Sequence, residues 1–315
     1  MNRRKFIYQS SGLALTAMAA PAFAKFAPAK DKMDRIAMGT LIFRDRFKQT
    51  KPKQVETITN ELTLMDIPQH HRDMYGIKKI EFWSEHFESL DKDYLTALKG
   101  KIKAAKCELL DVQFDSSQFD KTGYDLSNID EDKRRAGIDH VKKWMDGASF
   151  LGSKCVRVNP GGRAGKNPQG TVENCIKSFT ELLPYAKSKN LTIITANHTG
   201  LELNADNHVA ILKGTPGLYS EPDFGNYNNV NIMYDNLAKI IPYAYIVSAK
   251  VGTFTDTDGK LEHTSYDFDK CMQLSESLNF RGNYMVAQWS GYQPGIDYEK
   301  VAAWTIERIK ANIKA

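Results

Sequence analysis

Four strand-like segments in the second half of the chain end in positions at which a polar side chain could bind a ligand or take part in a reaction. These positions are Ala196 in TIITANHTG, Asp223 in EPDFGN, Ser248 in IVSAKVGTF and Gln288 in MVAQWSG. Asp223 is the one of the four that binds divalent metals strongly, because such ions prefer carboxylate and imidazole ligands. Side chains alternate along a strand, so residues two positions later are expected to share a facing. Those residues are His198, Lys250 and Ser290.

His198, Asp223 and Lys250 could together transfer a proton and stabilise a negative charge. An imidazole titrates near physiological pH and can act as the base, and Asp223 could orient it. Lys250 and Arg157 could stabilise a developing negative charge on a bound ligand. Structural roles stay open: His198 could cap a turn, and Lys250 could pair with Asp223. Arg157 could hold the carboxylate of Asp115.

Hydrogen-bonding and aromatic side chains at the ends of the predicted strands could bind a polyol. The substrate-binding candidates are Glu81, Trp83, Gln113, Asp115, Arg157, Asn159, Gln288 and Trp289. Amide, carboxylate and guanidinium groups can bond to sugar hydroxyls. A tryptophan face can stack on a sugar ring, although tryptophan also packs at the rim of a core. We therefore expect a small-molecule carbohydrate as the ligand.

Strand-like and helix-like segments that could position these residues alternate along the chain. The predicted strands are 35–43, 77–83, 108–114, 154–158, 191–195, 217–222, 244–249 and 283–288, and the clearest helices are 93–106, 132–150, 170–189 and 298–313. Eight strands, each followed by a helical segment, predict an α/β fold with a single (β/α)8 TIM barrel over residues 34–315. The active site of such a barrel lies at the C-terminal ends of its strands. The Asp-Gly turn in 255–259 predicts a hairpin over the barrel mouth or an exposed connection.

Three short segments resemble a known family. The segments are Ala196-Asn197-His198, Asp223-Phe224-Gly225-Asn226 and Ser248-Ala249-Lys250. They resemble strand ends of the xylose isomerase-like family of sugar isomerases and epimerases. The resemblance implies sugar or sugar-derived substrates and chemistry that begins with removal of a proton next to a carbonyl. It also implies one divalent ion, held at the ends of strands five to eight by Glu, Asp, His and Glu.

Most of the metal ligands implied by this resemblance are replaced, because the four positions hold Ala, Asp, Ser and Gln in this chain. Catalytic metal sites generally need three protein ligands, and one carboxylate does not supply them. We therefore expect no bound metal and no other cofactor. A shifted metal site that uses His198 or Glu81 is the alternative.

Two classes of protein fit these residues. The first prediction is an exported, metal-independent enzyme similar to sugar isomerases and epimerases. It would act on a free, oxidised or glycosidic sugar by isomerisation, epimerisation, or elimination and hydration. The alternative is a non-catalytic carbohydrate-binding barrel that has lost the family's metal site. Fold alone does not separate an enzyme from a binding protein.

The first 24 residues have the three parts of a secretory signal. The parts are a charged stretch with Arg3, Arg4 and Lys5, a weakly apolar stretch at 12–20 and the small-residue pattern Ala22-Phe23-Ala24. Two arginines followed by Phe6 predict a twin-arginine signal and export to the periplasm, with an ordinary secretory signal as the alternative. Cleavage near Ala24 would leave a linker at 25–33 before the barrel.

The overall composition limits the partners. The chain has 315 residues, 42% of them hydrophobic, and a formal charge of +5, which falls to +2 without the three basic residues of the signal. Nucleic-acid binding needs clustered basic charge, so none is expected, and no stretch is long and apolar enough to anchor the chain in a membrane. Four scattered cysteines, Cys107, Cys155, Cys175 and Cys271, predict buried thiols. The sequence leaves the oligomeric state open.

Overall fold

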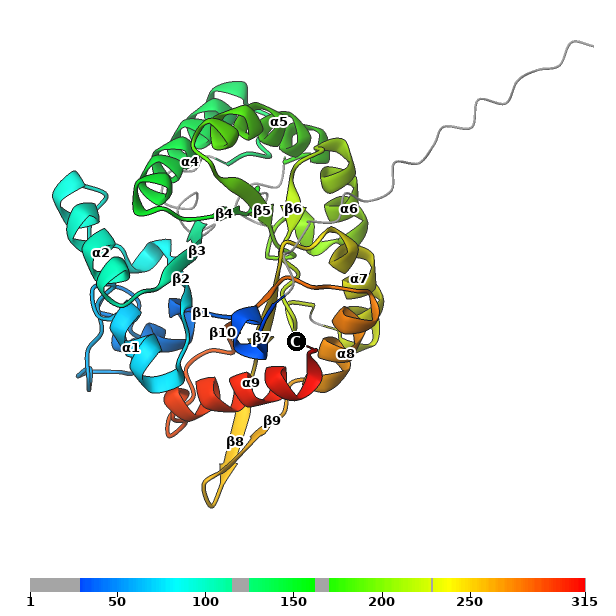
Figure 1. Ribbon diagram of the computed structural model, residues 1–315. Coiled ribbons are helices and arrows are strands. Elements are labelled where there is room, and N and C mark those ends of the chain that lie inside the picture. The colour runs from blue at the N-terminus through cyan, green and yellow to red at the C-terminus, as the bar shows by residue number, and fades with distance from the viewer. Residues whose placement is uncertain (1–28, 115–124, 162–169, 228, 315) are drawn as a thin grey trace, which may run out of the picture.

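Eight parallel strands form a closed barrel in the computed structural model of the protein, which describes residues 29–114, 125–161, 170–227 and 229–314. The strands are β1 (Ile36–Gly39), β2 (Lys79–Trp83), β3 (Glu108–Phe114), β4 (Cys155–Val158), β5 (Thr192–Thr195), β6 (Tyr219–Ser220), β7 (Ile246–Val251) and β10 (Asn283–Gln288). They pair in the order β6-β5-β4-β3-β2-β1-β10-β7. Parallel bridges from Ser220 to Ala244 and from Asp223 to Ser248 join β6 to β7 and close the ring (Figure 1). The predicted (β/α)8 TIM barrel is confirmed.

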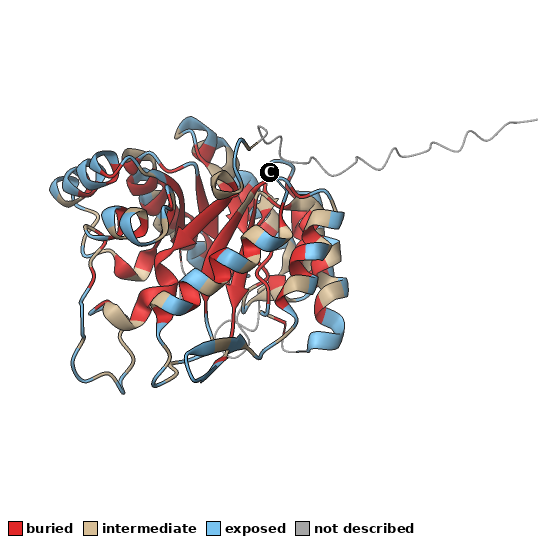
Figure 2. Ribbon diagram, turned by 60° about the horizontal axis from the view of Figure 1, so that its bottom comes forward, coloured by how far each residue is buried: buried red, intermediate tan, exposed pale blue. Residues whose placement is uncertain are grey.

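Helices lie between the strands in the chain and surround the barrel. They are α1 (Ile67–Tyr75), α2 (Lys92–Ala104), α4 (Glu131–Leu151), α5 (Val172–Ser188), α6 (Ala205–Gly214), α7 (Val230–Ile240), α8 (Phe268–Ser277) and α9 (Tyr298–Asn312). Asp130, Thr171 and Asp297 begin α4, α5 and α9, and their side chains accept hydrogen bonds from first-turn N–H groups. The helices in the foreground of Figure 2 have exposed residues on their outer side and buried residues toward the strands. The barrel core is therefore covered all round.

The first strand is shorter than the predicted segment 35–43. Strand β1 ends at Gly39, and a 3₁₀ helix follows over Thr40–Arg46. Leu41, Ile42 and Phe43 in that helix are buried, so an apolar run that reads as a strand in the sequence instead packs as a turn at the rim of the barrel. This turn directs Arg44 toward the barrel mouth.

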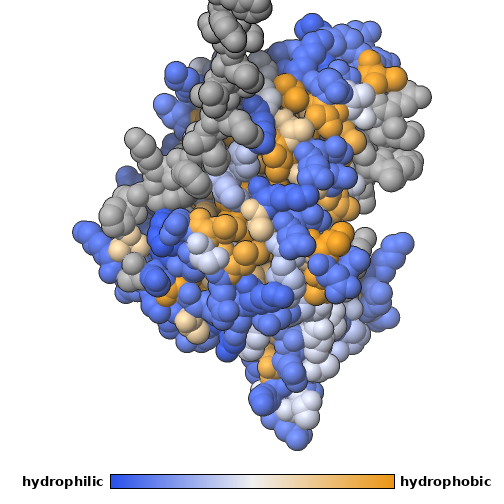
Figure 3. Space-filling model, turned by 90° about the vertical axis from the view of Figure 1, so that its right-hand side faces the viewer, coloured by the Kyte–Doolittle hydropathy of each residue, from blue (hydrophilic) through white to orange (hydrophobic). Residues whose placement is uncertain are grey.

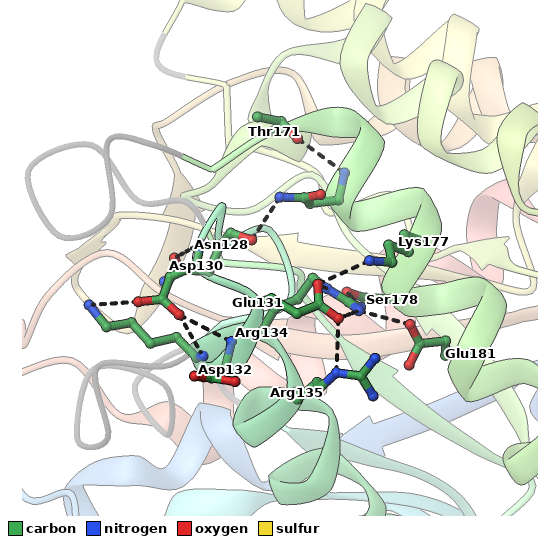
Figure 4. A network of polar contacts seen from close by, with 12 residues as sticks. Asn128, Asp130, Glu131, Asp132, Arg134, Arg135, Thr171, Lys177, Ser178 and Glu181 are labelled. Carbon is green, nitrogen blue, oxygen red and sulfur yellow. Dashed lines mark hydrogen bonds and ion pairs between the residues drawn. The ribbon is translucent and has the colours of Figure 1, made fainter.

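A polar network joins α4 to α5 on the outside of the barrel (Figure 4). The side chain of Arg134, fully buried, donates hydrogen bonds to both carboxylate oxygens of Glu131, at 2.9 and 3.1 Å. It also bonds Ser178 Oγ at 2.9 Å and Glu181 Oε1 at 2.8 Å, both on α5. Arg135 reaches Glu131 from the exposed side of α4. The guanidinium of Arg134 thus fastens the two helices together.

The Asp-Gly turn forms a hairpin between β8 (Phe254–Thr257) and β9 (Lys260–His263). Asp258 and Gly259 have φ values of 53° and 81°, as a tight hairpin turn of this sequence requires. Figure 1 shows the hairpin extending away from the barrel beside α9, and most of its residues are exposed. It is therefore an exposed connection that takes the form of a hairpin.

The barrel interior is apolar toward the N-terminal ends of the strands, away from the barrel mouth. Six side chains fill it: Ala37, Leu110, Cys155, Ile194, Ile246 and Met285. All four cysteines are free thiols, three of them buried and Cys107 half-buried. In the described part of the chain no helix is long and apolar enough to span a membrane. Figure 3 shows the outer surface over α6 to α8 as mainly hydrophilic, interrupted by small hydrophobic patches.

Candidate active site

A cavity of about 800 Å³ opens at the C-terminal ends of the strands. Five of the predicted site residues line it: Trp83, Gln113, His198, Lys250 and Trp289. Glu85, two positions after Trp83, lines it as well, and so does Arg44, which the sequence did not indicate. A volume of this size suits a small-molecule ligand. Five other predicted residues are buried and do not line the cavity, namely Glu81, Arg157, Asn159, Asp223 and Gln288, and Asp115 lies outside the described residues.

Asp223 lies at the centre of a buried charge cluster. Its Oδ2 atom accepts hydrogen bonds from Arg157 Nη2 at 2.7 Å and from Asn226 Nδ2 at 2.8 Å. Lys250 Nζ lies 3.7 Å from the same oxygen and donates to Asn226 Oδ1 at 2.7 Å. Burial alone would raise the pKa of Asp223, but Arg157 and Lys250 hold that pKa well below its usual range. Asp223 is therefore an ionised carboxylate between two cations.

Hydrogen bonds to the backbone fix this cluster in place. Asn197 Oδ1 accepts from the Asp223 N–H at 2.7 Å, and Asn197 Nδ2 donates to the Asp223 carbonyl at 3.1 Å. Asn159 Oδ1 accepts from the Ala196 N–H at 3.1 Å, so this predicted substrate-binding side chain ties β4 to β5. Such bonds hold the charged groups in one geometry before any ligand arrives.

His198 and Lys250 face the same cavity from two different strand ends. His198 follows β5 and is half-buried, and its Nδ1 lies 3.3 Å from Thr199 Oγ1. Once the imidazole has taken up a proton, its positive charge lowers the pKa of Asp223 in the same direction as Arg157 and Lys250 do. Lys250 pairs with Asp223, as the structural alternative for it predicted, and its ammonium also reaches the cavity. A possible proton acceptor, His198, and a cation, Lys250, therefore line the same cavity.

The expected facing of Gln288 is wrong. The sequence predicted that it shares the facing of Ser248 and Lys250, but the register pairs it with Val251, while Ala287 pairs with Lys250. Because paired residues of parallel strands face the same side, Gln288 points away from the barrel interior. Its Oε1 accepts a hydrogen bond from Arg44 Nη1 at 3.0 Å, so it positions a residue that lines the cavity.

Glu81, Asp111 and Glu221 form a second buried group, the acid layer. One carboxylate oxygen from each lies within 4.8 Å of the other two, and Arg157 Nη1 lies 3.6 Å from Glu221 Oε2. Burial and then Glu221 raise the pKa of Asp111 to about 7, and burial is also the largest cause of the raised pKa values of Glu81 and Glu221. Protons or a cation could balance these charges.

The acid layer depends on a glycine and includes a residue that sequence reasoning missed. A Cβ atom at Gly39 would lie 2.5 Å from Glu81 Oε1, so any larger residue there would displace the carboxylate. Glu221 was not among the predicted site residues. It lies two positions before Asp223, and the alternation of side chains used for the other strands could have placed it on the same face.

Aromatic rings form one wall of the cavity. The rings of Trp83 and Trp289 meet edge to face, with centroids 6.3 Å apart, and the Arg44 guanidinium lies 4.3 Å from the Trp289 ring centre. Trp289 is 51% exposed, whereas Trp83 is buried. The exposed indole offers a flat apolar surface to a ligand.

Comparisons with known proteins agree with this architecture. The profile described as "Xylose isomerase-like TIM barrel" matches residues 73–312. A xylose isomerase-like TIM barrel protein from Mycobacterium smegmatis, solved with magnesium, is 12% identical over 89% of this chain and 98% of its own, with a TM-score of 0.61. The 3-keto-D-glucoside 4-epimerase of E. coli is 13% identical over 86% of this chain and 98% of its own, with a TM-score of 0.58.

A sugar phosphate isomerase/epimerase from Parabacteroides distasonis is 11% identical over 88% of this chain and 92% of its own, with a TM-score of 0.55. Identities this low show a shared fold, and a sequence search of curated proteins gave no match. The family profile covers most of the chain. The protein therefore belongs to the xylose isomerase-like TIM barrel family of sugar isomerases and epimerases.

Proposed function

We propose that the protein is a metal-independent enzyme that removes a proton next to the carbonyl group of a free, oxidised or glycosidic sugar. The observation that carries this proposal is the pair of cations, Arg157 and Lys250, held against Asp223 directly beneath the cavity. Lys250 lines the cavity beside His198. A fixed positive charge next to a proton acceptor is what enolate formation requires.

The residues near Asp223 fit a divalent ion poorly. Of the four positions where the family resemblance implies ligands, Ala196 offers no ligand atom and Gln288 faces away from the barrel interior. The Asp223 oxygen that would bind metal already bonds Arg157 and Asn226 and lies near Lys250. An added dication there would be repelled by two neighbouring positive charges. The arrangement supports Lys250 and Arg157 as the source of the charge.

The proposed step uses only side chains of this chain. The His198 imidazole takes a proton from the carbon beside the carbonyl, and the electron pair of that C–H bond moves toward the carbonyl oxygen. The Lys250 ammonium stabilises the resulting enolate oxygen. If the bound enolate turns over before His198 returns the proton to the same carbon, the product is an epimer. If a proton first moves from the neighbouring hydroxyl to the enolate oxygen and His198 then protonates the former carbonyl carbon, the product is an isomer. If a hydroxyl on the carbon next to the deprotonated carbon instead leaves as water, with the proton that His198 holds, the result is elimination.

Proton–deuterium exchange into 3-keto-sugars and free sugars tests this step directly. Lys250→Met and His198→Ala should each lower the exchange rate by about 100-fold, because losing one fixed electrostatic or proton-transfer group typically costs that much. Lys260→Met, on the exposed hairpin, is the matched control and should exchange like the wild type. Wild-type rates in both cavity variants would refute these roles.

A carbohydrate-binding barrel without catalysis is the second candidate, and the tryptophan wall favours it. The exposed Trp289 indole beside Trp83 could hold a sugar ring whether or not any proton moves. This candidate predicts sugar binding that is unchanged by Lys250→Met and His198→Ala, with no exchange on any keto-sugar. Binding measured by calorimetry beside the exchange assay separates the two candidates.

We also propose that the protein is exported to the periplasm and begins near Lys25 after cleavage. The order of charged, apolar and small residues in the first 24 positions supports this, and the arginine pair supports the twin-arginine route. Residues 1–28 lie outside the described structure. N-terminal sequencing of protein from the cell envelope tests the proposal, and an intact Met1 on cytoplasmic protein would oppose it.

A further inference from the structure

Arg44 differs from the other buried arginines among the described residues. Arg35, Arg134 and Arg157 each form an ion pair with at least one carboxylate, at 2.8, 2.8 and 2.7 Å. Arg44 is only 7% exposed but has no such partner in the described part of the chain. Burying an unpaired charge is costly, so proteins normally provide a counter-charge. No carboxylate among the described residues forms such an ion pair with Arg44.

The neighbouring Asp45 does not fill this role. Arg44 lines the barrel-mouth cavity, whereas Asp45 lines a separate hollow together with Arg46 and Glu299. Burial lowers the pKa of Arg44, while Tyr298 and Asp45 oppose that change through their charges. The guanidinium therefore faces the cavity without a carboxylate against it.

The side chain of Arg44 is held in position, but some of its N–H groups have no hydrogen-bond acceptor among the described residues. Its Nη1 bonds Gln288 Oε1 at 3.0 Å and the Gln288 carbonyl at 3.3 Å. Thr50 Oγ1 donates to the Arg44 carbonyl at 2.8 Å, and the Trp289 ring covers the guanidinium at 4.3 Å. Among the described residues, Nε and Nη2 make no hydrogen bond. A planar fork fixed in this way suits a carboxylate, which accepts two parallel hydrogen bonds.

We propose that the cavity binds a sugar acid, with its carboxylate on Arg44. The inference rests on the proposed function only for the reacting end of the ligand, which would face His198 and Lys250 in the same cavity. A carboxylate, with one negative charge, matches the single guanidinium. The positive charges of Arg157 and Lys250 are already shared with Asp223. A neutral sugar would leave Arg44 buried and uncompensated.

Calorimetry with glucuronate, glucose and glucose 6-phosphate tests the sugar-acid proposal. Glucuronate should bind wild type at least about 10-fold more tightly than glucose, because a charge-assisted bidentate pair is among the stronger hydrogen-bonded contacts. Arg44→Gln should remove this preference and leave the weak binding of glucose unchanged. Arg44→Lys should restore only part of it, since an ammonium keeps the charge but lacks the fork. Arg281→Gln, a half-exposed arginine at the other end of β10, is the matched control.

Several results would overturn the sugar-acid proposal. They are equal or undetectable binding of glucuronate and glucose to wild type, an equal loss of both ligands in Arg44→Gln, and tighter binding of glucose 6-phosphate than of glucuronate. The exchange assay reports on the proposed function separately. A preference for the carboxylate without exchange on any keto-sugar or keto-acid would refute the proposed enzyme function and leave the sugar-acid site supported. Exchange on neutral sugars without that preference would support the enzyme function and refute the sugar-acid site.

Discussion

Four buried carboxyl groups lie beneath the cavity, and the cations placed against them are Arg157 and Lys250. Asp223 is ionised because both cations lie against it. The three carboxyl groups of the acid layer have Arg157 as their counter-charge, and Asp223 already balances part of its positive charge. Carboxyl groups that are buried with too little positive charge keep protons at neutral pH. The acid layer is therefore the part of the site whose charge changes with pH.

Asp111 gives this pH dependence a defined sign. Its pKa is about 7 in the folded protein and 3.8 in an ordinary environment. Between these values the folded state keeps a proton that the unfolded chain releases, so the contribution to stability is present at low pH and is lost as the pH rises through about 7. Asp111→Asn removes the titration. It also keeps an acceptor for the Arg157 N–H, which Asp111 Oδ1 binds at 3.0 Å.

We expect the stability of Asp111→Asn relative to wild type to rise with pH. The difference in free energy of unfolding should move in favour of the variant by more than about 1 kcal/mol between about pH 4 and about pH 8. Urea unfolding at several pH values measures it. Asp256→Asn, on the exposed hairpin, should show no such trend. Parallel pH curves for wild type and Asp111→Asn would mean that Asp111 is ionised throughout.

At the scale of single residues the sequence located the catalytic candidates but not all of their contacts. His198, Asp223 and Lys250 were found because the ends of parallel strands meet at one edge. Gln288 was misplaced because its facing depends on the register of β10 against β7, which the sequence does not state. Arg44 was missed although it directly follows the predicted strand 35–43, because the 3₁₀ helix over Thr40–Arg46 that carries it was not predicted.

The Arg134 network joins helices α4 and α5 (Figure 4). Arg134→Met should lower the free energy of unfolding by about 2 to 3 kcal/mol. It removes the hydrogen bond that the buried Ser178 Oγ accepts, and it removes the cation that bonds both Glu131 and Glu181. Arg135→Met is the matched control. Its ion pair with Glu131 is exposed, so the loss should stay below about 0.5 kcal/mol. Equal effects of the two substitutions would contradict this explanation.

Strand positions were predictable where apolar residues are bounded by clear turn signals. Strands β3 and β10 have the predicted bounds 108–114 and 283–288. Strand β6 has only two residues, although 217–222 was expected, and beyond it Asp223 forms an isolated bridge to Ser248 of β7. Short pairings of this kind depend on the neighbouring strand, and the local sequence does not determine them.

For the whole molecule, the alternation of strands and helices was sufficient to predict the barrel, whereas the metal content needs a measurement. We expect elemental analysis of the purified protein to find no divalent metal at one per chain, and a chelator to leave activity unchanged, because the cations at Asp223 oppose such an ion. Glu221→Gln provides a check. A stoichiometric metal that disappears in this variant would place an ion in the acid layer and contradict the prediction.

The exposed indole of Trp289 makes the cavity observable by light. The chain has four tryptophans, and of these Trp289 is 51% exposed at the cavity while Trp83 and Trp144 are buried. The emission of an indole shifts to shorter wavelength when a bound molecule replaces the water around it. A ligand that settles against Arg44 would also change the cation above this ring. Titrations can therefore follow the natural fluorescence of the protein, without a label and before the reaction is known.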